Sequence, residues 1–176
     1  MRKEVTSARI EDFMRALGAA VSLPSRIYLV GGATAVLLGW RHATIDLDLK
    51  IIPESDEIFR GLPALKERLQ INIELASPAD FIPELPGWQE RSRFIKQERK
   101  LTFFHYDFYA QALAKIERGH EMDLHDVEEM FRRGLIEPQR LLQLFVDIED
   151  QIYRYPALDG PSFRRAVERA IREQEP

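Results

Sequence analysis

The sequence has 176 residues, of which 45% are hydrophobic and 31% charged, as in an ordinary globular protein long enough to bury a core. It contains no cysteine, which excludes disulfides, thiolate metal sites and a cysteine nucleophile and suits a reducing compartment. The net charge of −4 argues against nucleic-acid binding through overall positive charge. No apolar run approaches the ~20 residues that span a bilayer, and the first residues lack a signal-peptide core. We therefore expect a cytoplasmic protein with no membrane partner.

Helix-like and strand-like patterns alternate in the first part of the chain. Apolar residues at helical spacing predict a first helix that ends at Pro24, and Gly39 suits the left-handed end of a second, short helix. A third helical segment is expected to break near Gly61 and Pro63. In chain order, the predicted helices and strands cover residues 7–22 (helix), 26–30 (strand), 33–38 (helix), 44–52 (strand), 55–69 (helix) and 71–75 (strand).

The second part of the chain changes character after residue 77. Three prolines predict an ordered loop over 77–87, and two short strands follow at 93–97 and 100–104. The rest is predicted to be helical, over residues 107–118, 123–133, 138–155 and 161–173. The predicted fold class is α+β, with a small mixed β-sheet and helices over 1–105 and a helical region packed on it over 106–176.

A glycine pair followed by two aspartates is the most informative motif. Gly31-Gly32 separates a strand-like run from a helix-like run, and Asp46-Leu47-Asp48 lies in the next predicted strand. Strand residues two apart point to the same face, so both carboxylates are expected to project together. Two carboxylates beside a glycine turn can hold a divalent metal and a triphosphate. The alternative is a tight turn followed by the solvated face of a sheet.

Other side chains could complete such a site. Glu74, in the next predicted strand, is the best candidate for a third carboxylate, although it also fits a solvent-facing position. Arg41 precedes the acidic strand and could clamp a phosphate, or it could be a solvated surface residue. The basic stretch 91–100 could guide RNA, but it equally suits a solvated hairpin edge. The aromatic residues of 103–109 are interpreted as core rather than as a base-stacking platform.

These motifs together resemble a known superfamily. Gly31-Gly32, Arg41, Thr44, Asp46-Leu47-Asp48, Asn72-Ile73-Glu74 and the following Pro-Ala-Asp-Phe stretch are similar to the polymerase-beta-like nucleotidyltransferases. Within that superfamily the sequence is most similar to small bacterial and archaeal proteins related to the toxins of abortive-infection toxin–antitoxin pairs. The resemblance covers roughly residues 26–133.

The resemblance implies an αβ palm that holds Mg²⁺ (or Mn²⁺) and moves NMP from an NTP to an acceptor hydroxyl. Asp46 and Asp48 would be metal ligands, and Glu74 a ligand or the base for the hydroxyl. Lys115 would steady the triphosphate, with Asp123 and Asp126 orienting it or contacting nucleotide. The nucleotide-binding residues implied in this way are Gly31, Gly32, Arg41, Thr44, Lys115 and Asp123.

The acceptor is left open between tRNA, a protein and a small molecule, because the fold alone does not choose among them. A toxin would also have a cognate antitoxin as its partner. Two features depart from the family pattern, since Met122 stands where a basic residue often precedes the first aspartate and the longer lysine motif is incomplete. The alternative function is therefore a catalytically degenerate nucleotide-binding or protein-interaction domain of the same fold.

Overall fold

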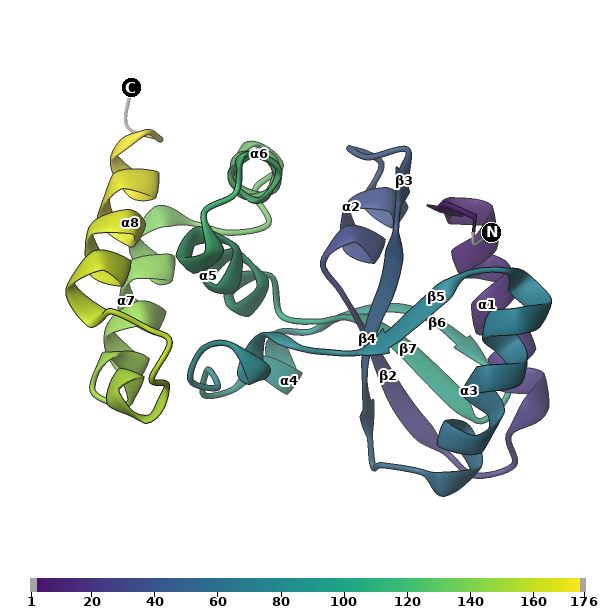
Figure 1. The fold of residues 1–176 in the computed structure, drawn as a ribbon. Helices are drawn as coiled ribbons and strands as arrows, with labels where there is room; N and C mark the ends of the chain where they lie inside the picture. The colour runs from purple at the N-terminus through teal and green to yellow at the C-terminus, as the bar shows by residue number, and fades with distance from the viewer. Residues whose placement is uncertain (1–2, 175–176) are drawn as a thin grey trace. The chain divides into compact units, whose positions relative to one another are not determined.

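The computed structural model describes residues 3–174 and divides into two compact units (Figure 1). The first comprises residues 3–77 and 92–106, and the second comprises residues 78–91 and 107–174. Strands and helices together make up the first unit, whereas the described part of the second unit contains helices and no strand. This combination confirms the α+β fold class.

A five-stranded mixed sheet forms the centre of the first unit, in the order β5-β4-β2-β7-β6. β2 pairs antiparallel with β4 and parallel with β7, β4 pairs parallel with β5, and β6 pairs antiparallel with β7. A separate pair joins β1 and β3. The elements of this unit are β1 (Val5–Thr6), α1 (Ser7–Ala20), β2 (Ser25–Val30), α2 (Gly32–Leu38), β3 (Ala43–Thr44), β4 (Asp46–Ile52), α3 (Asp56–Leu69), β5 (Asn72–Leu75), β6 (Arg93–Glu98) and β7 (Leu101–His105).

The two faces of this sheet differ because side chains alternate along each strand. On one face, Leu47 and Leu49 are fully buried in a core that includes Phe13 of α1 and Leu65 of α3. Helices α1 and α3 lie side by side over this face (Figure 1). The other face carries the intermediate positions of β4, beginning with Asp46, and we call it the palm face.

The second unit is built around α5, which packs against α6, α7 and α8. Phe145 and Phe163 form an edge-to-face ring pair in its core, with centroids 4.9 Å apart. The proline-rich segment is ordered, since the Tyr155 hydroxyl donates to the carbonyl of Ala79 at 3.1 Å. The elements of this unit are η1 (Pro78–Asp80), α4 (Trp88–Arg91), α5 (Phe108–Arg118), α6 (Glu121–Arg132), α7 (Pro138–Glu149), η2 (Ile152–Arg154) and α8 (Gly160–Arg172). Among the described residues, no helix combines the length and apolarity needed to cross a bilayer.

Three predicted boundaries were wrong. The break expected near Pro63 does not occur, because α3 buries Leu62 and Leu65 and tertiary packing outweighs the unfavourable proline. The strand expected over 44–52 is two strands with different partners, separated by Ile45. The helix expected over 138–155 ends at Glu149 and is followed by a short 3₁₀ turn.

Candidate functional site

The glycine pair forms a turn at the end of β2 in which each glycine is required for a different reason. Gly31 has φ +62°, a backbone conformation that residues with a side chain rarely adopt. A β-carbon added to Gly31 would lie 3.6 Å from Oδ2 of Asp48, so this backbone runs close to the acidic strand. A β-carbon added to Gly32 would overlap Oγ1 and Cβ of Thr44. The turn is therefore packed directly against the residues that precede and form the acidic strand.

The strand pairings bring the predicted carboxylates onto the palm face. Asp48 lies opposite Val30 of β2 on one side and Glu74 of β5 on the other. Asp46 lies opposite Asn72 of β5. Because paired residues of neighbouring strands project to the same side of a sheet, the three carboxylates share this face.

Asn72 links two of these carboxylates. Its Nδ2 donates to Oδ1 of Asp46 at 2.7 Å and to Oε1 of Glu74 at 2.8 Å. The amide thus fixes the position of both carboxylates and leaves their other oxygens as acceptors. Asn72 was predicted only as part of a motif, and its role in linking the carboxylates was not predicted. The available signal was its position two residues before Glu74, on the same side of an alternating strand.

The donor chemistry of this group fits magnesium. Asp46 and Asp48 offer hard carboxylate oxygens from one rigid strand, next to a turn with no side chain at Gly31. Within residues 3–174, no three histidine or acidic side chains gather closely enough to hold an ion by themselves. Mg²⁺ in nucleotide enzymes is usually held by one or two carboxylates, with waters and substrate phosphates completing its shell. Glu74 as a third ligand remains a prediction.

A buried polar pair that was not predicted from the sequence lies next to the glycine turn. Oγ1 of Thr34, in the first turn of α2, lies 3.1 Å from Nδ1 of His105 at the end of β7. Both residues are buried, and burial, assisted by the positive charge of Arg93, lowers the pKa of His105 to about 4. The imidazole is therefore neutral at physiological pH. No local pattern reveals this pair, because its members are far apart in the sequence.

Arg41 follows α2 in the loop that leads to β3. Its backbone N–H donates to the carbonyl of Ala35 at 3.3 Å, which extends the glycine-ended cap of that helix. Its side chain is half-buried and belongs to the same unit as the acidic strand. Binding of phosphate by Arg41, and of nucleotide by Thr44, remains a prediction.

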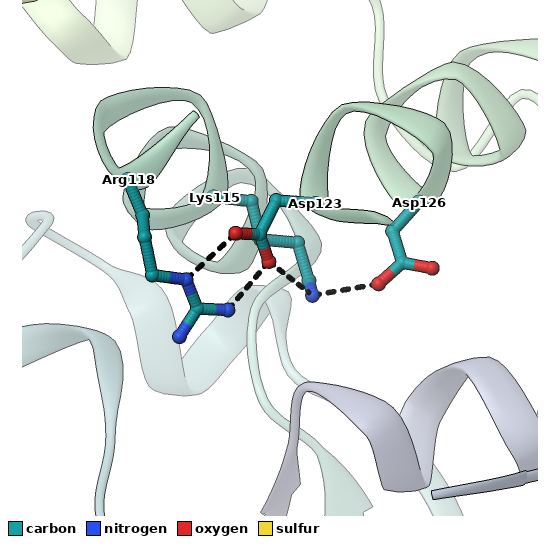
Figure 2. Close-up of polar contacts among 4 residues, drawn as sticks. All are labelled: Lys115, Arg118, Asp123 and Asp126. Carbon is teal, nitrogen blue, oxygen red and sulfur yellow. Dashed lines mark hydrogen bonds and ion pairs between the residues drawn. The ribbon is translucent and has the colours of Figure 1, made fainter. Parts of the chain in front are cut away.

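Three predicted residues, Lys115, Asp123 and Asp126, lie in the other unit together with Arg118, whose role was not predicted (Figure 2). Lys115 and Arg118 come from α5, whereas Asp123 and Asp126 come from α6. Nζ of Lys115 lies 2.7 Å from Oδ2 of Asp126 and 3.6 Å from Oδ1 of Asp123. The guanidinium of Arg118 binds both oxygens of Asp123. We call these four residues the α5–α6 ion cluster.

The α5–α6 ion cluster is nearly closed to solvent. The side chains of Lys115, Asp123 and Asp126 are 6%, 5% and 0% exposed, whereas that of Arg118 is 55% exposed. Burial alone would raise the pKa of Asp123, but Arg118 and Lys115 outweigh that effect and lower it. Asp123 is therefore ionised at neutral pH and holds Lys115 in place together with Asp126. The ion pairs place Lys115 between the two aspartates, and the contact of these three residues with nucleotide remains a prediction.

Comparison with known proteins identifies the family. A family model described as "Nucleotidyltransferase of unknown function (DUF6036)" matches residues 8–166. No curated protein and no solved structure matches the chain. The matched region includes both the acidic strand and the α5–α6 ion cluster. The chain therefore belongs to this family of nucleotidyltransferases of unknown function.

Proposed function

We propose that the protein is a Mg²⁺-dependent nucleotidyltransferase that moves NMP from an NTP to an acceptor hydroxyl. The observation that carries the proposal is the pair Asp46 and Asp48, held on the palm face beside the side-chain-free turn at Gly31. The family assignment supports the reaction class. Metal dependence and the identity of the donor rest on the chemistry of the residues.

Each residue of the first unit has a distinct task in this proposal. Asp46 and Asp48 would hold the metal ion, which would supply positive charge for the α-phosphate and the leaving pyrophosphate. Gly31 lets a phosphate approach the backbone, and Arg41 adds a bidentate donor for phosphate oxygens. Glu74, positioned by Asn72, accepts the proton of the acceptor hydroxyl. The hydroxyl oxygen forms a bond to the α-phosphorus while the bond to pyrophosphate breaks, so NMP is transferred and pyrophosphate leaves.

Calorimetric titration of each of the four NTPs, with and without Mg²⁺, tests the proposal. We expect one nucleotide to bind in a Mg²⁺-dependent manner to the wild type and to lose this binding in Asp46→Asn/Asp48→Asn. The asparagines keep the shape of the carboxylates but remove the charge that a divalent ion requires. Asp147→Asn, which changes an exposed aspartate of α7, is the matched control and should bind like the wild type.

The result separates the two functions that the sequence allows. Undiminished Mg²⁺-dependent NTP binding in the double asparagine variant would overturn the proposed metal site. Tight binding that never yields pyrophosphate with any acceptor would instead favour the catalytically degenerate domain. Release of pyrophosphate in a coupled assay, lost in the same variant, would support transfer.

A further inference from the structure

A row of aromatic rings crosses the palm face next to the carboxylates. Tyr28 of β2 lies opposite Phe104 of β7, which lies opposite Phe94 of β6. Tyr28 and Phe104 are stacked with ring centroids 5.2 Å apart, and Phe94 meets Phe104 edge-to-face at 6.1 Å. Tyr28 is also two residues before Val30, which lies opposite Asp48. We call Tyr28, Phe104 and Phe94 the ring row, and it lies next to the row of carboxylates on the palm face.

The outer end of this row is exposed. Tyr28 is buried, Phe104 is partly buried, and Phe94 is 59% exposed at the edge strand. Phe94 thus presents a ring to solvent, while its neighbour Phe104 supports it from within the sheet.

Positive charge lies beside the ring row. Arg26, two residues before Tyr28 on β2, is exposed and lies on the palm face opposite Thr102. The turn between β6 and β7 adds Arg99 and Lys100, which are also exposed. The whole chain carries a net charge of −4, so this concentration of cations is local. Along the palm face, the row of carboxylates, the ring row and the row that contains Arg26 therefore follow one another.

We propose that this surface binds the acceptor of the reaction, and that the acceptor is a single-stranded polynucleotide. Stacked aromatic side chains flanked by cations are the combination that holds single strands without reading their sequence. Phe94 takes a base, with Phe104 and Tyr28 supporting it from within the sheet, and the cations take phosphates, while the carboxylates stay with the reacting hydroxyl. This inference rests on the proposed function, because it names the substrate of the same site.

The spacing assigns Phe94 to a nucleotide before the reacting one. Three interstrand steps of about 4.8 Å separate β6 from β4, so Phe94 lies roughly 14 Å across the sheet from the acidic strand. A base on Phe94 is too far away to belong to the nucleotide whose hydroxyl is at Asp48. Phe94 would therefore affect acceptor binding and leave NTP binding unchanged.

Fluorescence anisotropy with labelled oligo-U, oligo-A and oligo-dT tests the inference, without Mg²⁺ or NTP. We expect Phe94→Ala to weaken binding about tenfold, because the loss of one stacking ring has an effect of this order. Phe94→Tyr keeps the ring and should bind like the wild type. Phe81→Ala is the matched control, since Phe81 is 55% exposed but lies in the other unit. Arg26→Gln should reduce the dependence of log K on log salt by about 0.7, the loss of one phosphate contact to a single strand.

The outcomes are distinct from those of the metal site. Unchanged NTP binding by Phe94→Ala in calorimetry, together with weaker oligonucleotide binding, supports the inference. Equal oligonucleotide affinity in the wild type and Phe94→Ala, or no binding at low salt, overturns it, and the acceptor is then a protein or a small molecule. Neither result changes the interpretation of the NTP titrations with Asp46→Asn/Asp48→Asn. Thermal melts of each variant establish that the fold is retained.

Discussion

At the scale of single residues, Gly31 and Gly32 show how one dipeptide meets two separate requirements. Gly31 supplies a backbone conformation, whereas Gly32 supplies the space that Thr44 occupies. Thr44 precedes the acidic strand by two residues, so this packing holds the turn and the strand together. A substitution at Gly32 is therefore expected to disturb both.

We predict that Gly32→Ala destabilises the protein by about 1–3 kcal/mol, as overpacking of a filled position does. Gly61 is the matched control, since it lies inside α3 and a β-carbon there would meet no atom within 4 Å. Gly61→Ala should stabilise the protein by roughly 0.5–1 kcal/mol, because alanine is the better helix former. Urea denaturation measures both. Equal effects of the two substitutions would contradict the packing argument.

The same residues show how much of the site the sequence could predict. The common direction of Asp46 and Asp48 follows from strand periodicity, which is a local rule. The links from Asn72 to Asp46 and Glu74 depend on the register between β4 and β5, which no local pattern specifies. The contact between Thr34 and His105 joins residues from two distant elements, so it also required the structure.

At the scale of elements, the patterns with clear periodicity gave the correct type of structure. The apolar spacing of α1 and the alternation in β5 are examples, and both elements occur where they were expected. The errors arose where packing or pairing overrides the local preference. Pro63 lies inside a continuous helix because the apolar face of α3 is buried, and Ile45 divides one expected strand into two with different partners.

The buried ion pairs of the α5–α6 ion cluster allow a prediction about the stability of the protein. Asp126→Asn should destabilise the protein by about 3–5 kcal/mol, because it leaves the buried ammonium of Lys115 without its closest counter-charge. Lys115→Met/Asp126→Leu should recover most of that loss, since an apolar pair of similar volume removes both buried charges. Arg118→Ala is expected to cost much less, because that side chain is largely exposed. Thermal denaturation compares the three variants.

The apolar double variant also tests the nucleotide role predicted for Lys115. It keeps the helices packed but lacks the ammonium, so stability and binding can be read separately. If Lys115 contacts the triphosphate, calorimetry should show weaker NTP binding in a variant of near-native stability. NTP binding equal to that of the wild type would assign the cluster to the packing of α5 against α6 alone.

At the scale of the whole molecule, the chain enters the second unit twice. Residues 78–91 join the helices, and the chain then returns to the first unit for β6 and β7. The three prolines of this segment predicted a loop, but they did not indicate that the loop belongs to the second unit. The basic hairpin and the acidic strand thus belong to one unit even though this segment separates them in the sequence. The palm face therefore needs β6 and β7, which follow this segment in the sequence.

Stability of the whole molecule should fall in mildly acidic solution because of His105. Its pKa is about 4 in the folded protein and near 6.5 when unfolded, so the unfolded chain binds more protons between these values. The stabilisation that neutral His105 gives the folded protein is fully present above pH 6.5 and is lost as the pH falls toward 4. At 1.36 kcal/mol per pKa unit, the loss amounts to about 3 kcal/mol. Asp123 has a lowered pKa, so the stability that its ionised form contributes is lost only at pH values below the range in which His105 titrates.

His105→Gln removes the titrating group but keeps a side chain that can hydrogen-bond to Thr34. We expect urea denaturation at a series of pH values to show a smaller loss of stability between pH 6.5 and 4 in this variant than in the wild type. His125→Gln is the matched control, since His125 is exposed on α6, and its profile should follow that of the wild type. Contributions from carboxylates are common to all three proteins and cancel in the comparison. Parallel curves of unfolding free energy against pH for the wild type and His105→Gln would contradict the prediction. They would mean that the imidazole is not buried as a neutral group next to Thr34.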